Sequence, residues 1–157
     1  MANIKYIDYG GEIHMSIFLD LRTSQGTRSG AVSNTATSPD YVAGIGLQVD
    51  TGTDIRVDLE ATFGVKAGSD DTTFTATVNR YTDAANITTF SLGTPVFTQK
   101  FLLEQSGDTS AFSLSAADIV ATAPASKQLS YALYISADKS GSTYQGQQNL
   151  IGTANAD

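Results

Sequence analysis

The chain has 157 residues, of which 41% are hydrophobic, a formal net charge of −7 and no cysteine. This length fits a single domain spanning residues 1–157, and the hydrophobic content is high enough for a buried core. The nine basic residues are scattered singly, which argues against a nucleic-acid partner because phosphate contacts need clustered Lys and Arg. The absence of cysteine excludes disulfides, thiolate catalysis and Cys-based zinc sites.

Residues 1–11 are expected to form an N-terminal extension. They contain neither the basic segment nor the apolar segment of a secretory signal. No window of the chain holds the ~18 consecutive apolar residues that cross a bilayer. We therefore expect cytoplasmic synthesis, no membrane span and, for a protein that works outside a cell, release without a signal peptide.

The first clear strand follows this extension. Its apolar residues recur at every second position, and polar residues occupy most of the positions between them, which is the period of a half-buried strand. The apolar set is Ile13, Met15, Ile17, Leu19 and Leu21. Residues 23–44 are rich in Ser, Thr, Gly, Asn and Ala, and we expect them to form a long loop.

The same alternation returns along the rest of the chain, between turn signals rich in Gly, Asp and Ser. It predicts strands over 45–49, 55–65, 74–78, 97–103 and 129–137, with shorter candidates at 5–9, 87–92, 111–114 and 143–150. The one helical signal is a capping-box pattern over 115–120, which predicts a turn or two at most. Eight to ten short strands without intervening helices predict an all-β fold, namely a sandwich, a jelly roll or a barrel. Of these we expect an antiparallel two-sheet sandwich with jelly-roll topology.

Two acidic pairs are candidate calcium ligands, namely Asp70 with Asp71 and Asp50 with Asp54. Calcium takes six to eight oxygens, whereas a short cluster of this kind supplies two or three. Exposed turn acids are therefore the simpler interpretation, and we expect no other cofactor.

No catalytic residue is expected. Asp50, Thr51 and Gly52 match the triplet of aspartic proteases, which share one proton between two carboxylates. Asp54 follows so closely that a third carboxylate would disturb this arrangement, so a hairpin turn explains the triplet better. His14 is the only histidine and lies on the polar face of its strand.

Tyrosine side chains are the candidates for carbohydrate binding, because sugar-binding sandwiches commonly present exposed aromatic platforms. Tyrosine also occurs on sheet faces and at subunit contacts, so the two uses stay open. The candidates are Tyr6, Tyr9, Tyr41, Tyr81, Tyr134 and Tyr144.

Four segments carry a resemblance to a known family, namely 55–65, 74–81, 90–92 and 129–135. Over 55–138 the chain resembles the globular heads of collagen-like spore-surface (exosporium) glycoproteins, which are trimeric jelly rolls related to tumour necrosis factor and complement heads. The resemblance implies a trimer on a spore surface. The chain departs from the family in having no Gly-X-Y stretch before the head, and in having Arg80-Tyr81-Thr82-Asp83 where the family has an Arg-Asp-Gly turn.

The sequence thus leads to a ranked set of hypotheses. The first is a structural, non-enzymatic protein that self-assembles into a homo-oligomer, a trimer or a fibre, on a spore or phage particle. Assembly would use the sheet faces or a strand added by residues 1–11 to the edge of a neighbour's sheet. The alternative is a β-sandwich module that binds carbohydrate or another surface ligand, with or without calcium. An aspartic protease is the only enzyme that the residues suggest.

Overall fold

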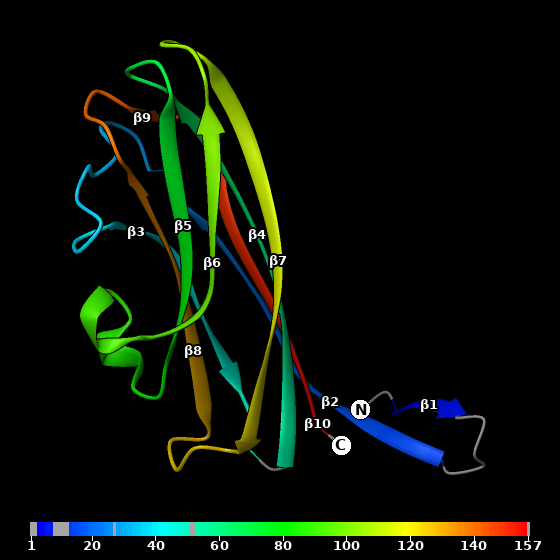
Figure 1. Ribbon diagram of the computed structural model, residues 1–157. Coiled ribbons are helices and arrows are strands. Elements are labelled where there is room, and N and C mark those ends of the chain that lie inside the picture. The colour runs from blue at the N-terminus through cyan, green and yellow to red at the C-terminus, as the bar shows by residue number, and fades with distance from the viewer. Residues whose placement is uncertain (1–2, 8–12, 27, 51–52, 157) are drawn as a thin grey trace.

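The computed structural model describes residues 3–7, 13–26, 28–50 and 53–156, with the backbone alone described at 3–7 and 13–16. Strands dominate it and form two antiparallel sheets (Figure 1). The strands are β1 (Asn3–Ile7), β2 (Ile13–Gly26), β3 (Asp40–Gln48), β4 (Thr53–Lys66), β5 (Thr72–Tyr81), β6 (Thr94–Leu103), β7 (Thr109–Thr122), β8 (Gln128–Ala137), β9 (Thr143–Tyr144) and β10 (Gln148–Ala156). Two short 3-10 helices, η1 (Ala84–Asn86) and η2 (Phe90–Leu92), lie between β5 and β6.

The strand order defines the fold. One sheet has the order β1-β2-β10-β4-β7, with β9 paired to one end of β4, and the other has the order β3-β8-β5-β6. Apart from β1 and β9, eight strands fill the two sheets, and the chain crosses between the sheets at every connection except β5 to β6. This is the connectivity of a jelly roll. The predicted all-β, two-sheet jelly roll is therefore confirmed.

The core lies between the sheets and follows the predicted alternation. On β4 the inward residues from Ile55 to Phe63 are buried, whereas most of the residues between them are exposed. The inward residues of β3 and β5, such as Leu47 and Phe74, are buried in the same way. Strand β8 differs, because both of its faces are buried over almost its whole length.

The outer face of β8 is buried because residues 82–93 fold over it. This segment contains η1 and η2 and packs Ile87 and Phe90 against Tyr134 of β8. The strand predicted at 87–92 is thus wrong. Apolar residues in this short run serve a loop that covers a sheet, and periodicity alone does not distinguish that role from a strand.

The helical turn predicted at 115–120 is also wrong, since these residues belong to β7. They pair with β4 from Ser115 opposite Glu60 to Val120 opposite Ile55. The ladder with β4 outweighs a local capping pattern, because every residue from 115 to 120 pairs with a residue of β4.

Strand β2 contains a register shift opposite Ala154 and Asn155 of β10. A bulge moves every later side chain to the opposite face. As a result Leu21, predicted to point inward, is 51% exposed, and the polar side chain of Asp20 turns toward β3, where it accepts the N–H of Gln48. Leu21 is therefore removed from the inward-facing set predicted for β2.

The loop predicted at 23–44 is shorter than expected, because β2 continues to Gly26 and β3 begins at Asp40. At the other end of the chain, β10 extends through the small, polar residues 152–156. Their inward positions hold glycine and alanine, which fit beneath the side chains of the facing sheet. Within the described ranges, no helix has the length and apolar character needed to cross a membrane.

Part of β2 extends beyond the sandwich. Strand β10 pairs with β2 only from Ile17 to Gly26, whereas residues 13–16 pair with β1 alone. Figure 1 shows this two-stranded extension projecting away from the sandwich at the end where the C-terminus lies. We call residues 3–7 together with 13–16 the β1–β2 arm. The predicted N-terminal extension thus contains a strand over 3–7, and residues 1–2 and 8–11 lie outside the described ranges.

Candidate functional site

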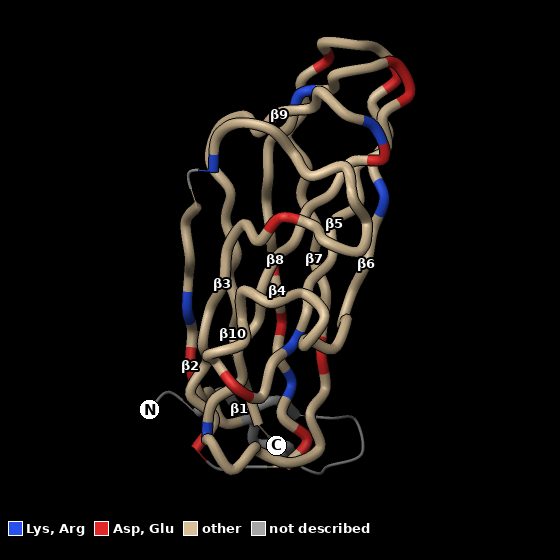
Figure 2. The backbone as a smooth tube through the Cα atoms, turned by 90° about the vertical axis from the view of Figure 1, so that its left-hand side faces the viewer, with Lys and Arg blue, Asp and Glu red and all other residues tan. Residues whose placement is uncertain are grey.

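Of the four predicted calcium ligands, Asp70 and Asp71 lie in the turn before β5, Asp50 follows β3, and Asp54 lies at the start of β4. The carboxylate of Asp70 accepts the N–H of Ser106 at 2.7 Å, and Asp71 is exposed with a left-handed backbone. The carboxylate of Asp50 accepts a hydrogen bond from the Gln48 amide at 2.6 Å, and Asp54 also has a left-handed backbone. Figure 2 shows acidic and basic residues in the loops at the β9 end of the sandwich and again toward the opposite end.

Across the residues that the structure describes, no three His, Cys, Asp or Glu side chains are grouped so as to hold a metal ion. Two positions of the Asp50 triplet, Thr51 and Gly52, lie outside the described residues, as does the side chain of His14. Calcium binding therefore stays a prediction.

A charged cluster connects β7 of the larger sheet to β5 and β8 of the smaller sheet. Arg80 of β5 donates through Nη1 to both carboxylate oxygens of Asp118 on β7, at 3.0 and 2.8 Å. The buried hydroxyl of Tyr131 on β8 donates to the same carboxylate at 2.9 Å. Burial, together with the neighbouring Asp118, raises the pKa of Tyr131. The cluster thus satisfies a partly buried charge and connects β7 to the facing sheet.

A second cluster holds the connection between β2 and β3. The carboxylate of Asp40 accepts hydrogen bonds from Arg28, from the N–H of Ser33 and from the hydroxyl of Tyr144, at 2.6, 2.8 and 3.0 Å. The Arg28 guanidinium also lies over the Tyr144 ring. Burial and the adjacent carboxylate raise the pKa of Tyr144. This cluster fixes the path of residues 28–39 against β9.

Two tyrosines anchor the segment that covers β8. The hydroxyls of Tyr81 and Tyr134 lie 2.7 Å apart, and they donate to the backbone oxygens of Thr89 and Ile87 at 3.1 and 2.5 Å. Asn79 is also buried here and donates to the backbone oxygen of Phe90. Burial raises the pKa of Tyr134.

These contacts remove most of the candidate carbohydrate platforms. Tyr81, Tyr134 and Tyr144 are buried, and Tyr41 is half-buried with its ring edge against Tyr134. The side chains of Tyr6 and Tyr9 lie outside the described residues. The sequence placed Tyr41 in the predicted loop 23–44, and it gave no sign that residues 82–93 cover the outer face of β8.

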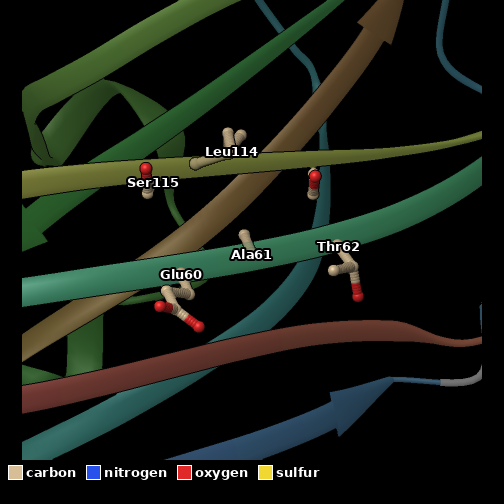
Figure 3. Close-up of a pocket in the computed structure, with 6 residues that line it drawn as sticks. Glu60, Ala61, Thr62, Leu114 and Ser115 are labelled. Atoms are coloured by element: carbon tan, nitrogen blue, oxygen red, sulfur yellow. The ribbon is translucent and has the colours of Figure 1, made fainter.

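The most open surface is the outer face of β2, β10, β4 and β7. Glu60 and Thr62 of β4 and Ser115 of β7 border a shallow hollow there of about 290 Å³ (Figure 3). A second hollow, of about 500 Å³, continues past Glu60 toward Arg56 and Asp58. The Arg56 guanidinium pairs with Asp58 at 2.9 Å.

Exposed apolar side chains collect on the same sheet. Phe18 and Leu21, at the base of the β1–β2 arm, are 37% and 51% exposed on the outer face, and Ile119 of β7 is 69% exposed. Ile17, opposite the buried Ala156, lies on the inner face and is 41% exposed. One register row joins Phe18 to Asn155, Arg56 and Ile119 across the four strands. The sequence predicted Leu21 as a core residue and so missed this surface. Only the register of β2 with β10 reveals it.

The fold is a jelly-roll β-sandwich. Its clustered charged and tyrosine side chains bind one another, and its exposed apolar residues lie beside the β1–β2 arm. No protein-family model matches the chain. No curated protein matches it either.

Solved structures of similar fold include two ligands of the tumour necrosis factor class and a viral particle protein. Eiger TNF from S. frugiperda has a TM-score of 0.49 and 10% identity, and the match covers 90% of this chain and 94% of that chain. Murine APRIL has a TM-score of 0.46 and 9% identity over 85% and 98% of the two chains. The infectious bursal disease virus VP2 subviral particle has a TM-score of 0.43 and 10% identity, over 97% of this chain and 37% of that chain.

Proposed function

We propose that this chain is a structural, non-enzymatic protein that assembles with copies of itself. The observation that carries the proposal is the β1–β2 arm with its exposed apolar base at Ile17, Phe18 and Leu21. A two-stranded hairpin is only marginally stable alone in water, and a group of exposed apolar residues is typical of an interaction surface. Contact with a second copy would stabilise the arm and bury its base.

The clusters of ionisable groups support a structural role. Asp118 and Asp40 each accept three hydrogen bonds from within the chain, Asp118 from two residues and Asp40 from three. These contacts hold β7 against the facing sheet and residues 28–39 against β9. The carboxylates therefore serve the fold, which is the use expected in a scaffold.

We place the assembly at the surface of a particle, a phage particle or a spore. The support is the resemblance of residues 55–138 to trimeric spore-surface heads. Immunogold labelling of intact particles, with antibodies raised against the purified chain, tests this setting. Labelling confined to the cytoplasm of the producing cell would contradict it.

The assembly itself is tested by measuring the mass of the purified protein by light scattering over a range of concentrations, with negative-stain imaging. We expect oligomers. Leu21→Ser should raise the concentration of half-assembly about tenfold, because burying a leucine contributes ~2 kcal/mol and a tenfold change corresponds to ~1.4 kcal/mol.

Leu102→Ser is the matched control, because Leu102 on β6 is 52% exposed, as Leu21 is 51% exposed, but lies on the other sheet. Its half-assembly concentration should match that of the unchanged protein. A monomer at all concentrations would overturn the proposed function. Equal effects of the two substitutions would show that the apolar residues at the base of the arm are not part of the assembly contact.

A ligand-binding module is the second candidate, supported by the hollows that Glu60 and Ser115 border. Both hollows are shallow and on an open sheet face, whereas binding sites for small ligands are typically concave clefts that bury most of the ligand. Glycan-array binding by the monomer, lost in Glu60→Gln, would favour this candidate over assembly.

A further inference from the structure

The larger sheet ends in two edge strands, β1 and β7. In the order β1-β2-β10-β4-β7, the outer edges of β1 and β7 have no strand beside them among the described residues. Such edges present unpaired N–H and C=O groups and can pair with a strand of another chain. The arm carries the β1 edge away from the sandwich, so another molecule can reach it (Figure 1).

The edge of β7 lacks most of the features that usually prevent strand pairing. From Thr109 to Ala117 it has no charged residue and no proline, and its ladder with β4 shows no register shift from Lys66 opposite Thr109 to Ile55 opposite Val120. The single charge on the strand, Asp118, comes after this stretch and points toward Arg80. Nine consecutive residues of β7 therefore form an edge without protection.

Strand β6, the neighbouring edge in the smaller sheet, provides the contrast. It contains Pro95 and Lys100, and its pairing with β5 shifts register at Val78 and Asn79. Proline, lysine and bulges are the means by which natural sheets protect an edge from other chains. The chain thus protects one of two adjacent edges and leaves the other open.

The outer face of β7 suits a neighbouring strand. Its outward residues Ser113, Ser115 and Ala117 are small and exposed, so they leave room for side chains of an added strand. Ile119 follows with 69% exposure and offers an apolar contact to that strand.

Resting on the proposed function, we infer that β1 of one copy pairs with the free edge of β7 of the next copy and extends the larger sheet from molecule to molecule. Four antiparallel steps separate β1 from β7 within a chain, so the two strands run in the same direction. A head-to-tail repeat therefore joins them in parallel. Such an interface is heterologous, and it gives a ring if the rotation closes and a fibre if it does not.

Cysteine crosslinking tests this junction, because the chain contains no cysteine of its own. Chains carrying Ile4→Cys or Tyr6→Cys are mixed with chains carrying Ser113→Cys, Ser115→Cys or Ala117→Cys, and then oxidised. The register of the larger sheet places positions 4 and 6 of β1 on the same face as these β7 positions. Facing residues of paired strands lie close enough for a disulfide to form. We expect disulfide-linked dimers of the two mixed chains, with the β7 partner of position 6 lying C-terminal to the partner of position 4.

The matched control places the cysteine at Thr98→Cys on the edge of β6, where we expect no crosslink to β1. A β1–β6 crosslink, a reversed order along β7, or assembled protein that forms no β1–β7 crosslink would each overturn this inference and leave the proposed function standing. Protein that remains monomeric overturns both.

A second variant avoids oxidation. Ser115→Lys adds a charge to the open edge, and we expect the concentration of half-assembly to rise at least tenfold, whereas Thr98→Lys on β6 should leave it unchanged. Circular dichroism shows whether both variants keep the fold. A folded Ser115→Lys protein that assembles like the unchanged chain would overturn the inference.

Discussion

Asp118 lies on the edge strand β7, yet its carboxylate binds two residues of the opposite sheet. The Asp118 and Arg80 side chains are only 12% and 26% exposed, and the Tyr131 residue is fully buried. Three hydrogen bonds from Arg80 and Tyr131 replace the hydration that this carboxylate loses on burial. The effect on stability of removing the Asp118 carboxylate therefore depends on whether Arg80 and Tyr131 remain.

Asp118→Ala should lower the free energy of unfolding by about 3 kcal/mol, because it leaves the Arg80 charge and the Tyr131 hydroxyl without their acceptor. Urea unfolding followed by circular dichroism measures this. The double variant Asp118→Ala with Arg80→Met should cost at least ~1 kcal/mol less than the sum of the single changes. Strict additivity would show that the pair contributes nothing to stability.

At the scale of the element, β10 shows how two sheets fit together. Strand β10 lies between β2 and β4 and places Gly152 on its inward face, between the buried Leu150 and Ala154. A Cβ at position 152 would overlap the Cδ1 atom of Ile45 in the facing sheet. Glycine at this position therefore serves close packing between the sheets.

Gly152→Ala should destabilise the protein by about 1–3 kcal/mol, because the core residues around Ile45 must move. Without that overlap, alanine would stabilise a strand interior relative to glycine, so the sign of the change is informative. Thr153→Val, on the opposite face of β10, is the control, and we expect a change within ~0.5 kcal/mol. Thermal or urea unfolding decides the sign.

At the scale of the whole molecule, three tyrosines with raised pKa values hold three different places. Tyr131 lies between the sheets, Tyr134 on the covered outer face of β8, and Tyr144 beside Asp40. In each case burial is the largest cause, and a hydrogen bond or a nearby charge adds to it. Their contributions should add in the global unfolding equilibrium because the sites are separate.

Stability should fall as the pH rises above the ordinary tyrosine pKa of 10.0. The unfolded chain then loses phenolic protons that the folded chain retains, so alkali favours unfolding. Each tyrosine contributes a slope of up to ~1.4 kcal/mol per pH unit. Urea unfolding between pH 8 and 11 measures the slope, and absorbance at 295 nm should show these phenolates appearing together with unfolding. Their ionisation in a fully folded protein would contradict the prediction.

The sequence alone determined the fold class and the inward faces of most strands. Val57, Phe74 and Leu133 are examples of buried residues whose apolar neighbours lie two positions away along the chain. This spacing predicts strands that turn one face toward the core. Many short strands without helices restricted the fold to a sandwich, a jelly roll or a barrel, and the strand order came from the structure.

Only the tertiary structure decided which surfaces stay open. One bulge in β2 moved Leu21 to the outside, and residues 82–93 buried Tyr134, which local alternation left free. The pairing of Arg80 with Asp118 joins residues 38 positions apart, and the open edge of β7 exists only because no strand follows it in the sheet. Periodicity is a property of neighbours along the chain, whereas bulges, coverings and edges depend on contacts between segments that are distant in sequence.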